Sequence, residues 1–231
     1  MSVSEEDMNI PVASRLEAVA GRIPAGVTLV AVSKFHPAEM VREAYDAGQR
    51  VFGESRVQEF VEKRLQLPED IRWHFIGHLQ TNKVRKLIGL VSLIESVDTE
   101  RLLEVIDAES AKAGVVSRVL LQLHVAKEET KFGFSPEELA DYFTSRRFEN
   151  LNATHICGLM AMASNTDDEA RVRSDFAEAA SLFRRIRDDE SLGLRGFDIL
   201  SMGMSGDWPL AVEEGSNMVR VGSAIFGPRN Y

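Results

Sequence analysis

The feature that most constrains this chain is the regular alternation of short β-rich runs with helical patterns along its 231 residues. Several runs are almost continuously apolar, as expected for strands that are covered on both faces. Strands that alternate with helices form a parallel sheet with crossover helices, and eight such strands can close into a barrel. The runs are 28–33, 50–53, 73–77, 93–97, 118–125, 155–161, 199–203 and 218–222. The sequence therefore predicts the α/β class and a single (β/α)8 TIM barrel.

Helix signals between the runs agree with this architecture. Ser135-Pro136-Glu137-Glu138 combines an N-cap hydroxyl, a proline where no backbone donor is needed and a glutamate that can reach back to the cap. The segment 166–169 repeats the pattern and predicts a second helix start at Thr166. A further helix at 12–21 precedes the first run, and we expect it to pack across the bottom of the barrel. We expect residues 1–231 to form one domain, with 1–8 as a disordered tail.

Composition and charge narrow the function classes. No apolar run approaches the ~20 residues of a membrane helix, and the polar start lacks a secretory signal, so we expect a soluble, cytoplasmic protein without a membrane partner. A net charge of −9 argues against a nucleic-acid surface. The basic clusters 83–86 and 184–187 fall in helical patterns and are interpreted as solvated faces. The single cysteine, Cys157, is expected to be a buried side chain rather than a nucleophile.

Unusual polar residues collect at the ends of the predicted strands, which is where barrels of this kind carry their functional groups. In chain order they are Lys34, Glu54, Ser55, His78, Met160, Ser201, Ser205 and the segment 220–223. Because the carboxyl ends of the strands meet at one mouth, we expect these residues to surround a common site.

Two of these positions indicate a chemistry. A lysine at a strand end usually points to solvent, but Val32 and Phe35 flank Lys34, and loss of solvation favours the uncharged amine that attacks an aldehyde. Gly222 and Ser223 end the eighth run, where barrels bind phosphate through backbone amides. An ordinary strand and turn explains the Gly-Ser pair equally well.

Seven segments then match one family in order. They are Ala-Val-Ser-Lys at 31–34, Gly-Glu-Ser-Arg-Val-Gln-Glu at 53–59, Trp-His-Phe-Ile-Gly-His-Leu-Gln-Thr-Asn-Lys at 73–83, Thr-Lys-Phe-Gly at 130–133, Gly-Leu-Met at 158–160, Leu-Ser-Met-Gly-Met-Ser at 200–205, and Val-Arg-Val-Gly-Ser-Ala-Ile-Phe-Gly at 219–227. Each is weak alone, but together they span nearly the whole chain. On these motifs the chain resembles the pyridoxal 5′-phosphate (PLP) homeostasis protein family, also called YggS/PROSC, which is a one-domain relative of the alanine racemase barrel.

The resemblance implies that PLP is the cofactor and that Lys34 holds it as a Schiff base. It further implies the remaining cofactor contacts: Ser205, Gly222 and Ser223 at the phosphate, Arg220 at the pyridine nitrogen, and Ser201 and Met160 along the pocket. Ser55 departs from the family pattern, which usually has Gly-Glu-Asn-Tyr where this chain has Gly53-Glu54-Ser55-Arg56. A shorter hydroxyl thus replaces an asparagine that would contact the ring, and Ser55 is kept as a candidate contact.

Arg220 also bears on turnover. Arginine only donates hydrogen bonds and would leave the ring nitrogen unprotonated, which makes the ring a poorer electron sink. In the related racemases a second acid/base comes from an additional β domain of a partner subunit, whereas this chain stops at Tyr231. We therefore expect a PLP-binding protein for PLP homeostasis or delivery with little or no turnover, a monomer, and apo PLP-dependent enzymes as candidate partners.

Other interpretations stay open at this point. One is a narrow-specificity PLP-dependent amino-acid racemase, and another is a cofactor-independent enzyme that acts on phosphate esters through a Lys34 imine. Three histidines, at 74, 78 and 155, suggest a metal, but each lies on a different approach to the barrel, so no metal site is predicted. Lys131, after the fifth run, could close over the mouth or contact a partner.

Overall fold

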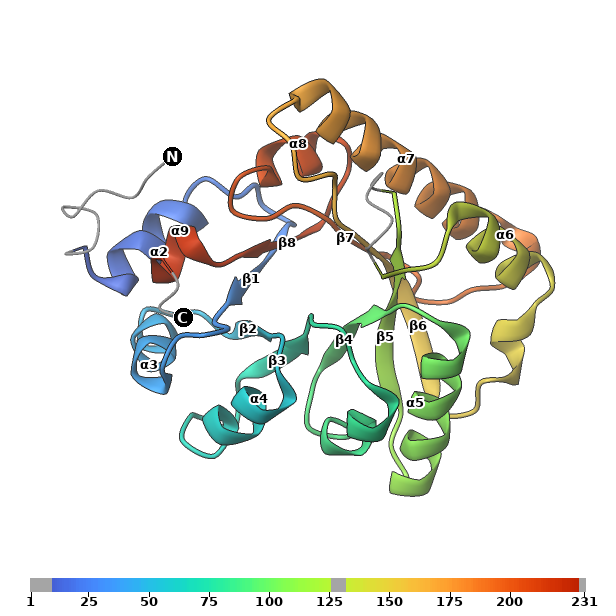
Figure 1. Ribbon diagram of the computed structural model, residues 1–231, viewed down its shortest axis with the longest axis horizontal. Helices are drawn as coiled ribbons and strands as arrows, with labels where there is room; N and C mark the ends of the chain where they lie inside the picture. The colour runs from blue at the N-terminus through green and yellow to red at the C-terminus, as the bar shows by residue number, and fades with distance from the viewer. Residues whose placement is uncertain (1–9, 126–131, 229–231) are drawn as a thin grey trace.

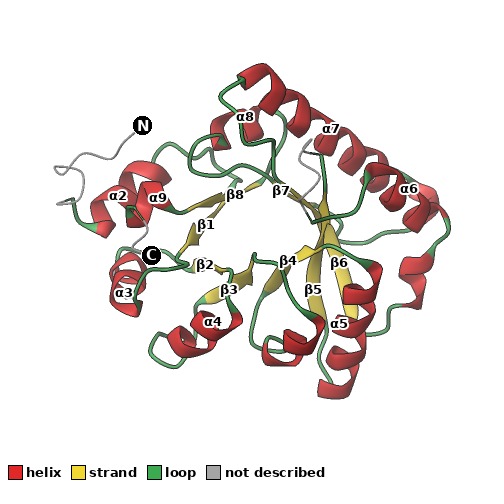
Figure 2. Cartoon of the chain, in the orientation of Figure 1, coloured by secondary structure: helices red, strands yellow, loops and turns green. Residues whose placement is uncertain are grey.

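The computed structural model describes residues 10–125 and 132–228, and its strands close into a parallel barrel in chain order (Figures 1 and 2). The strands are β1(Thr28–Val32), β2(Val51–Glu54), β3(Arg72–Phe75), β4(Leu93–Val97), β5(Ser117–Leu123), β6(Thr154–Ala161), β7(Ile199–Ser201) and β8(Met218–Val221). β8 pairs with β1 and closes the barrel. Each predicted run is a strand, with ends shifted by two residues at most. The predicted fold is confirmed.

The helices form an outer ring around the barrel (Figure 2). They are α2(Val12–Ala20), α3(Ala38–Asp46), α4(Val57–Arg64), α5(Glu100–Ala113), α6(Pro136–Thr144), α7(Glu169–Arg187), α8(Trp208–Glu213) and α9(Ser223–Phe226), with short 3-10 helices at Thr81–Lys86, Arg147–Asn150 and Glu190–Leu192. The predicted capping box at Ser135 begins α6. For α7 the predicted start is wrong: Asp168 rather than Thr166 is the N-cap, and its carboxylate accepts from the amides of Ala170 and Arg171.

The N-terminal helix lies elsewhere than expected. α2 packs beside α9 and α3 in the outer ring, not across the bottom of the barrel (Figure 1). Arg15 donates from Nε to the carbonyl of Ile225 at 2.7 Å, and the Ala13 amide donates to Glu43 at 3.1 Å. The reason is that α9 has only four residues, which leaves room in the ring that α2 covers.

Apolar side chains fill the inside of the barrel. The interior cluster contains Val30, Val51, Leu93, Leu120, Cys157, Met160 and Met218. Cys157 is fully buried and not disulfide-bonded, as predicted. This filling occupies the barrel below its mouth, and the predicted polar site residues lie above it towards the carboxyl ends of the strands.

The two basic clusters lie on the surface, as the sequence predicts. The basic side chains of the clusters 83–86 and 184–187 are exposed. Over the described ranges, none of the helices combines the length and apolarity that crossing a bilayer requires. The predicted tail at 1–8 and Lys131 lie outside the described residues.

Candidate functional site

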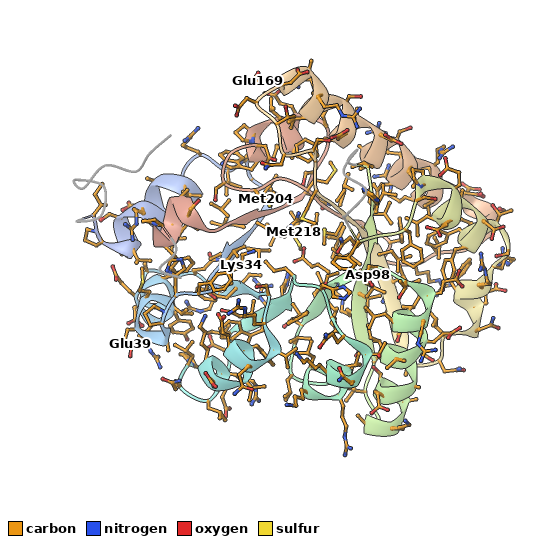
Figure 3. All side chains as sticks on the ribbon, in the orientation of Figure 1. Lys34, Glu39, Asp98, Glu169, Met204 and Met218 are labelled. Carbon is orange, nitrogen blue, oxygen red and sulfur yellow. The ribbon has the colours of Figure 1, made fainter. Side chains whose placement is uncertain are left out.

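The predicted site residues gather at the carboxyl-end mouth of the barrel. Lys34 follows β1 and Ser55 follows β2, while Gly222 and Ser223 follow β8 directly. Figure 3 shows Lys34 and Met204 near the barrel centre, whereas Glu39 and Glu169 lie towards its periphery. Ser201 ends β7, Arg220 lies within β8, and Met160 lies in β6 with 1% of its side chain exposed. The fold therefore brings together residues that are up to 189 positions apart, Lys34 and Ser223.

The Lys34 turn contains an unusual backbone conformation. Phe35 has φ of 67°, the left-handed region that a bulky residue seldom adopts. Its amide donates to Oε2 of Glu59 on α4 at 2.8 Å. The guanidinium of Arg56 lies 4.4 Å from the centre of the Phe35 ring. Contacts from the β2–α4 segment thus hold a turn that its own residues do not favour.

A buried ion pair contacts Ser33, the residue before Lys34. Lys63 of α4 donates from Nζ to Oε1 of Glu54 at 2.6 Å and to the carbonyl of Ser33 at 2.8 Å. The Ser33 hydroxyl donates to the same Glu54 oxygen at 2.7 Å. Burial raises the pKa of the Glu54 carboxyl, although Lys63 and the Ser33 hydroxyl oppose this shift. Oε2 of Glu54 is buried and has no hydrogen-bond partner among the residues that the structure describes.

Arg220 lies on β8, the strand that pairs with β1 on the side away from β2, and is 4% exposed. Nη1 donates to the Ser201 carbonyl at 2.9 Å and to the Ser201 hydroxyl at 2.6 Å, and Nη2 donates to the Ala161 carbonyl at 3.0 Å. Burial lowers the pKa of the Arg220 guanidinium, and the carboxylates of Glu95 and Asp207 oppose the shift. These bonds fix the guanidinium plane and, within the described part of the chain, leave Nε for a further acceptor.

Glu95 of β4 is the buried carboxylate beside Arg220. Its Oε1 lies 2.7 Å from Nδ1 of His74, and its Oε2 accepts from the Ser201 hydroxyl at 2.6 Å and lies 3.8 Å from Nη1 of Arg220. Burial pushes the pKa of the Glu95 carboxyl upward, but the hydrogen bond and charge of His74, with Arg220 and Ser201, outweigh it and lower the pKa. Glu95 is therefore a fully buried carboxylate that stays ionised.

The loops after β7 and β8 meet each other. The Gly222 amide donates to the Ser205 hydroxyl at 3.1 Å. A Cβ on Gly222 would stand 3.2 Å from the carbonyl of Val32, so only glycine fits without displacement of β1. Gly203 has φ of +89°, and a Cβ there would stand 2.7 Å from Cα of Trp208. The Ser205 hydroxyl and the Gly222 amide thus meet at the mouth, and groups of these two kinds bind phosphate in proteins.

The three histidines have separate partners. His74 pairs with Glu95, and Nε2 of His155 lies 2.6 Å from the carbonyl of Arg195. Nδ1 of His78 lies 2.7 Å from Oδ2 of Asp98, and the ring stacks on Phe132 with centres 3.9 Å apart. Within 10–125 and 132–228 no three potential His, Cys, Asp or Glu ligands form a metal-binding group.

Sequence reasoning missed three of these functional residues. Glu95 carried a usable signal, because an acidic residue inside a strand covered on both faces requires a buried partner. Lys63 and Glu59 carried none, since a Glu and a Lys four positions apart on a helix are usually a solvated pair. Only the fold shows that both reach the Lys34 turn.

Comparisons with known proteins agree with this geometry. The family model of the alanine racemase N-terminal domain matches residues 11–230. The pyridoxal phosphate homeostasis protein of Aquifex aeolicus is 39% identical over 213 residues, which cover 92% of this chain and 91% of that protein. The human protein of the same name is 40% identical over 217 residues, which cover 88% of this chain and 77% of the human protein. The solved structure of PipY from Synechococcus elongatus PCC7942, with PLP bound, has a TM-score of 0.84 and 38% identity, and covers 94% of this chain and 100% of that one.

Proposed function

Because the chain belongs to the pyridoxal phosphate homeostasis protein family, we propose that it binds PLP at the barrel mouth and serves PLP homeostasis in the cell. One observation carries the proposal: Lys34 and the β7 and β8 loops lie at the same mouth. β1 and β8 pair with Ala31 opposite Val221, so the residues that follow these two strands are neighbours. A lysine for an aldehyde and an anion cradle for a phosphate therefore stand at one site.

The residues at the mouth fit the cofactor. Lys34 would hold its aldehyde carbon, and Ser205, Gly222 and Ser223 would hold its phosphate. The fit rests on the close approach at Gly222, where a Cβ would meet Val32, and on the Ser205 hydroxyl within 3.1 Å of the Gly222 amide. These groups offer hydrogen-bond donors without a carboxylate, which suits an anion.

Arg220 fits the ring nitrogen. Its hydrogen bonds to other described residues come from Nη1 and Nη2, so Nε remains as a donor. Bound PLP supplies an aldehyde for a primary amine and a ring that withdraws electrons, and the second property is weak beside an arginine, which cannot accept a proton. We therefore propose little or no catalytic turnover.

Three further residues complete the proposed pocket. Ser201 holds Arg220 through both its hydroxyl and its carbonyl, so we assign it to the arginine side of the pocket. Met160 packs in the interior cluster below the mouth. Ser55 is half-buried directly after β2, on the side of Lys34. We also propose that the protein works in the cytoplasm as a monomer and passes PLP to apo PLP-dependent enzymes.

The test is covalent capture of the cofactor. Protein incubated with PLP is reduced with borohydride, and mass spectrometry of its peptides locates the added mass. We expect the adduct on Lys34, none in Lys34→Ala, and an unchanged adduct in the matched control Lys112→Ala, whose side chain is 70% exposed on α5. Retention of the visible cofactor band by Lys34→Ala would overturn the proposal.

Two further assays address what the cofactor is for. Transfer of PLP from the loaded protein to an apo acceptor enzyme should be faster than release into buffer alone. An assay over D- and L-amino acids should show no robust interconversion. Rapid racemisation that depends on Lys34 would instead support the racemase.

A further inference from the structure

We infer that Lys63 and Glu59 of α4 are positioning residues for Lys34, which act on it through the two peptide groups that flank it. Neither side chain is assigned to touch the cofactor. Each holds the backbone of one neighbour, Ser33 before Lys34 and Phe35 after it. The inference rests on the proposed function, in that Lys34 is the residue that attaches PLP.

On the Ser33 side, hydrogen bonds fix the orientation of the peptide that precedes Lys34. Lys63 is 6% exposed, and its Nζ donates both to the Ser33 carbonyl and to the fully buried Glu54. The Ser33 hydroxyl donates to the same carboxylate. Ser33 is therefore fixed by its carbonyl and by its side chain, through one charged pair. A lysine that only neutralised Glu54 would not need the second bond to the main chain.

The contact on the Phe35 side holds a conformation that is unfavourable on its own. With φ of 67°, the Phe35 peptide turns the chain sharply after Lys34, and its amide is bound by Oε2 of Glu59. The same Glu59 oxygen lies 3.5 Å from Nζ of Lys63. The two positioning residues are thus one turn apart on α4 and electrostatically coupled. Because a strained backbone persists only where its surroundings determine it, the direction of Lys34 depends on this helix.

A double substitution separates positioning from mere charge neutralisation. Lys63→Met alone leaves Glu54 buried without its cation, and we expect a loss of stability for that reason alone. Lys63→Met with Glu54→Gln removes both charges, while the amide oxygen at position 54 can still accept from Ser33. We expect the double variant to recover the melting temperature of the wild type but to bind PLP roughly tenfold more weakly, the effect of losing one charge-assisted hydrogen bond. We also expect the circular dichroism of its visible cofactor band to decrease, since that signal reports the fixed orientation of the link. Recovery of both affinity and dichroism would overturn the inference.

A second pair of variants needs no buried charge to be removed. Glu59→Ala deletes the acceptor of the Phe35 amide. Glu62→Ala on the same helix is the matched control, since Glu62 is exposed and, within the described residues, its carboxylate accepts only from Gln58. We expect weaker PLP binding and reduced visible dichroism for Glu59→Ala alone. Equal behaviour of the two variants would contradict the inference.

The outcomes also distinguish the inference from the function beneath it. If wild-type protein forms no Lys34 adduct, the proposed function fails. If wild type forms the adduct and the α4 variants match it in affinity and dichroism, the function stands and the positioning role fails.

Discussion

Two buried carboxylates, one at the end of β2 and one in β4, have pKa values that shift in opposite directions. Glu54 serves the Lys34 side, and burial raises its pKa. Glu95 serves the Arg220 side, and its pKa is lowered although it is equally buried. The difference lies in their oxygens: both oxygens of Glu95 are bonded, whereas Oε2 of Glu54 has no partner within the described part of the chain.

For these two acids the burial is the same, so the opposite pKa shifts follow from the hydrogen bonds and charges around each carboxyl. An ionised carboxylate accepts several hydrogen bonds, and each bond stabilises the charged form against desolvation. On the arginine side this fixes a permanent charge pair. On the lysine side, the acid beside the strained turn has one oxygen without a partner in the described residues, which suits the reversible link that we propose for Lys34.

The largest difference between the two carboxylates should appear in the free energy of unfolding when each is replaced by glutamine. We expect Glu95→Gln to reduce the free energy of unfolding by about 3–5 kcal/mol, because Arg220 and His74 are left buried without their anion. Glu54→Gln should cost less, about 1–2 kcal/mol, because Lys63 keeps the Glu59 carboxylate 3.5 Å away and the amide resembles the neutral acid that burial favours at position 54. Urea unfolding of both variants measures the two values. Equal losses would break the comparison.

Acid should affect the two carboxyls in opposite ways. The ordinary pKa of a glutamate is 4.5, and ionised Glu95 stabilises the fold fully above this pH. This contribution is lost as pH falls through the lowered pKa of Glu95. Glu54 has a raised pKa, so its ionised form opposes folding, and that penalty is relieved as pH falls through the raised pKa towards 4.5. The loss caused by Glu95→Gln should therefore shrink below pH 4.5.

The loss of unfolding free energy caused by Glu54→Gln should grow as pH falls from the raised pKa of Glu54 towards 4.5, because only the wild type gains stability there. Unfolding free energies of wild type and both variants, measured at a series of pH values, check both trends. A parallel dependence in the two variants would show that the carboxyls titrate alike.

A smaller change tests how Glu95 reaches Arg220. Ser201→Ala removes the hydroxyl that donates to Glu95 and accepts from Arg220. We expect a loss of about 1–2 kcal/mol in the free energy of unfolding, because the Ser201 carbonyl still accepts from Arg220. Ser33→Ala, which removes the equivalent hydroxyl under Lys34, is the matched variant in denaturant unfolding. A larger loss from Ser33→Ala would reverse the ranking of the two sides.

The smallest effect should come from the surface of the lysine side. Arg56 lies over the Phe35 ring, but its side chain is 62% exposed. We expect Arg56→Ala to change the unfolding free energy by less than about 1 kcal/mol and PLP affinity only slightly. Thermal unfolding and PLP titration measure the two effects. A loss of affinity as large as that of Glu59→Ala would place the control of the turn at the surface instead of on the buried face of α4.

Much of the architecture was predictable because local patterns specify it. Alternation of strand and helix signals located all eight strands, and the capping box at Ser135 located the start of α6. Predictions that depended on packing did less well. The helix at the N-terminus lies beside α9, and α7 starts from Asp168. The first difference follows from contacts with a segment more than 200 positions away in the chain, at Ile225. The second is a local choice between two possible caps, Thr166 and Asp168, which the pattern alone does not rank.

The site divides in the same way. Sequence by itself determined the barrel, its mouth, and the positions of Lys34, Arg220, Gly222 and Ser223, because strand ends and motifs are local properties of the chain. The tertiary structure alone decided how these residues are held: which carboxylate pairs with Arg220, and which helix fixes the turn at Lys34. The physical reason is that burial and hydrogen-bond partners come from residues distant in the chain, and these set both the charge of a buried acid and the direction of a side chain.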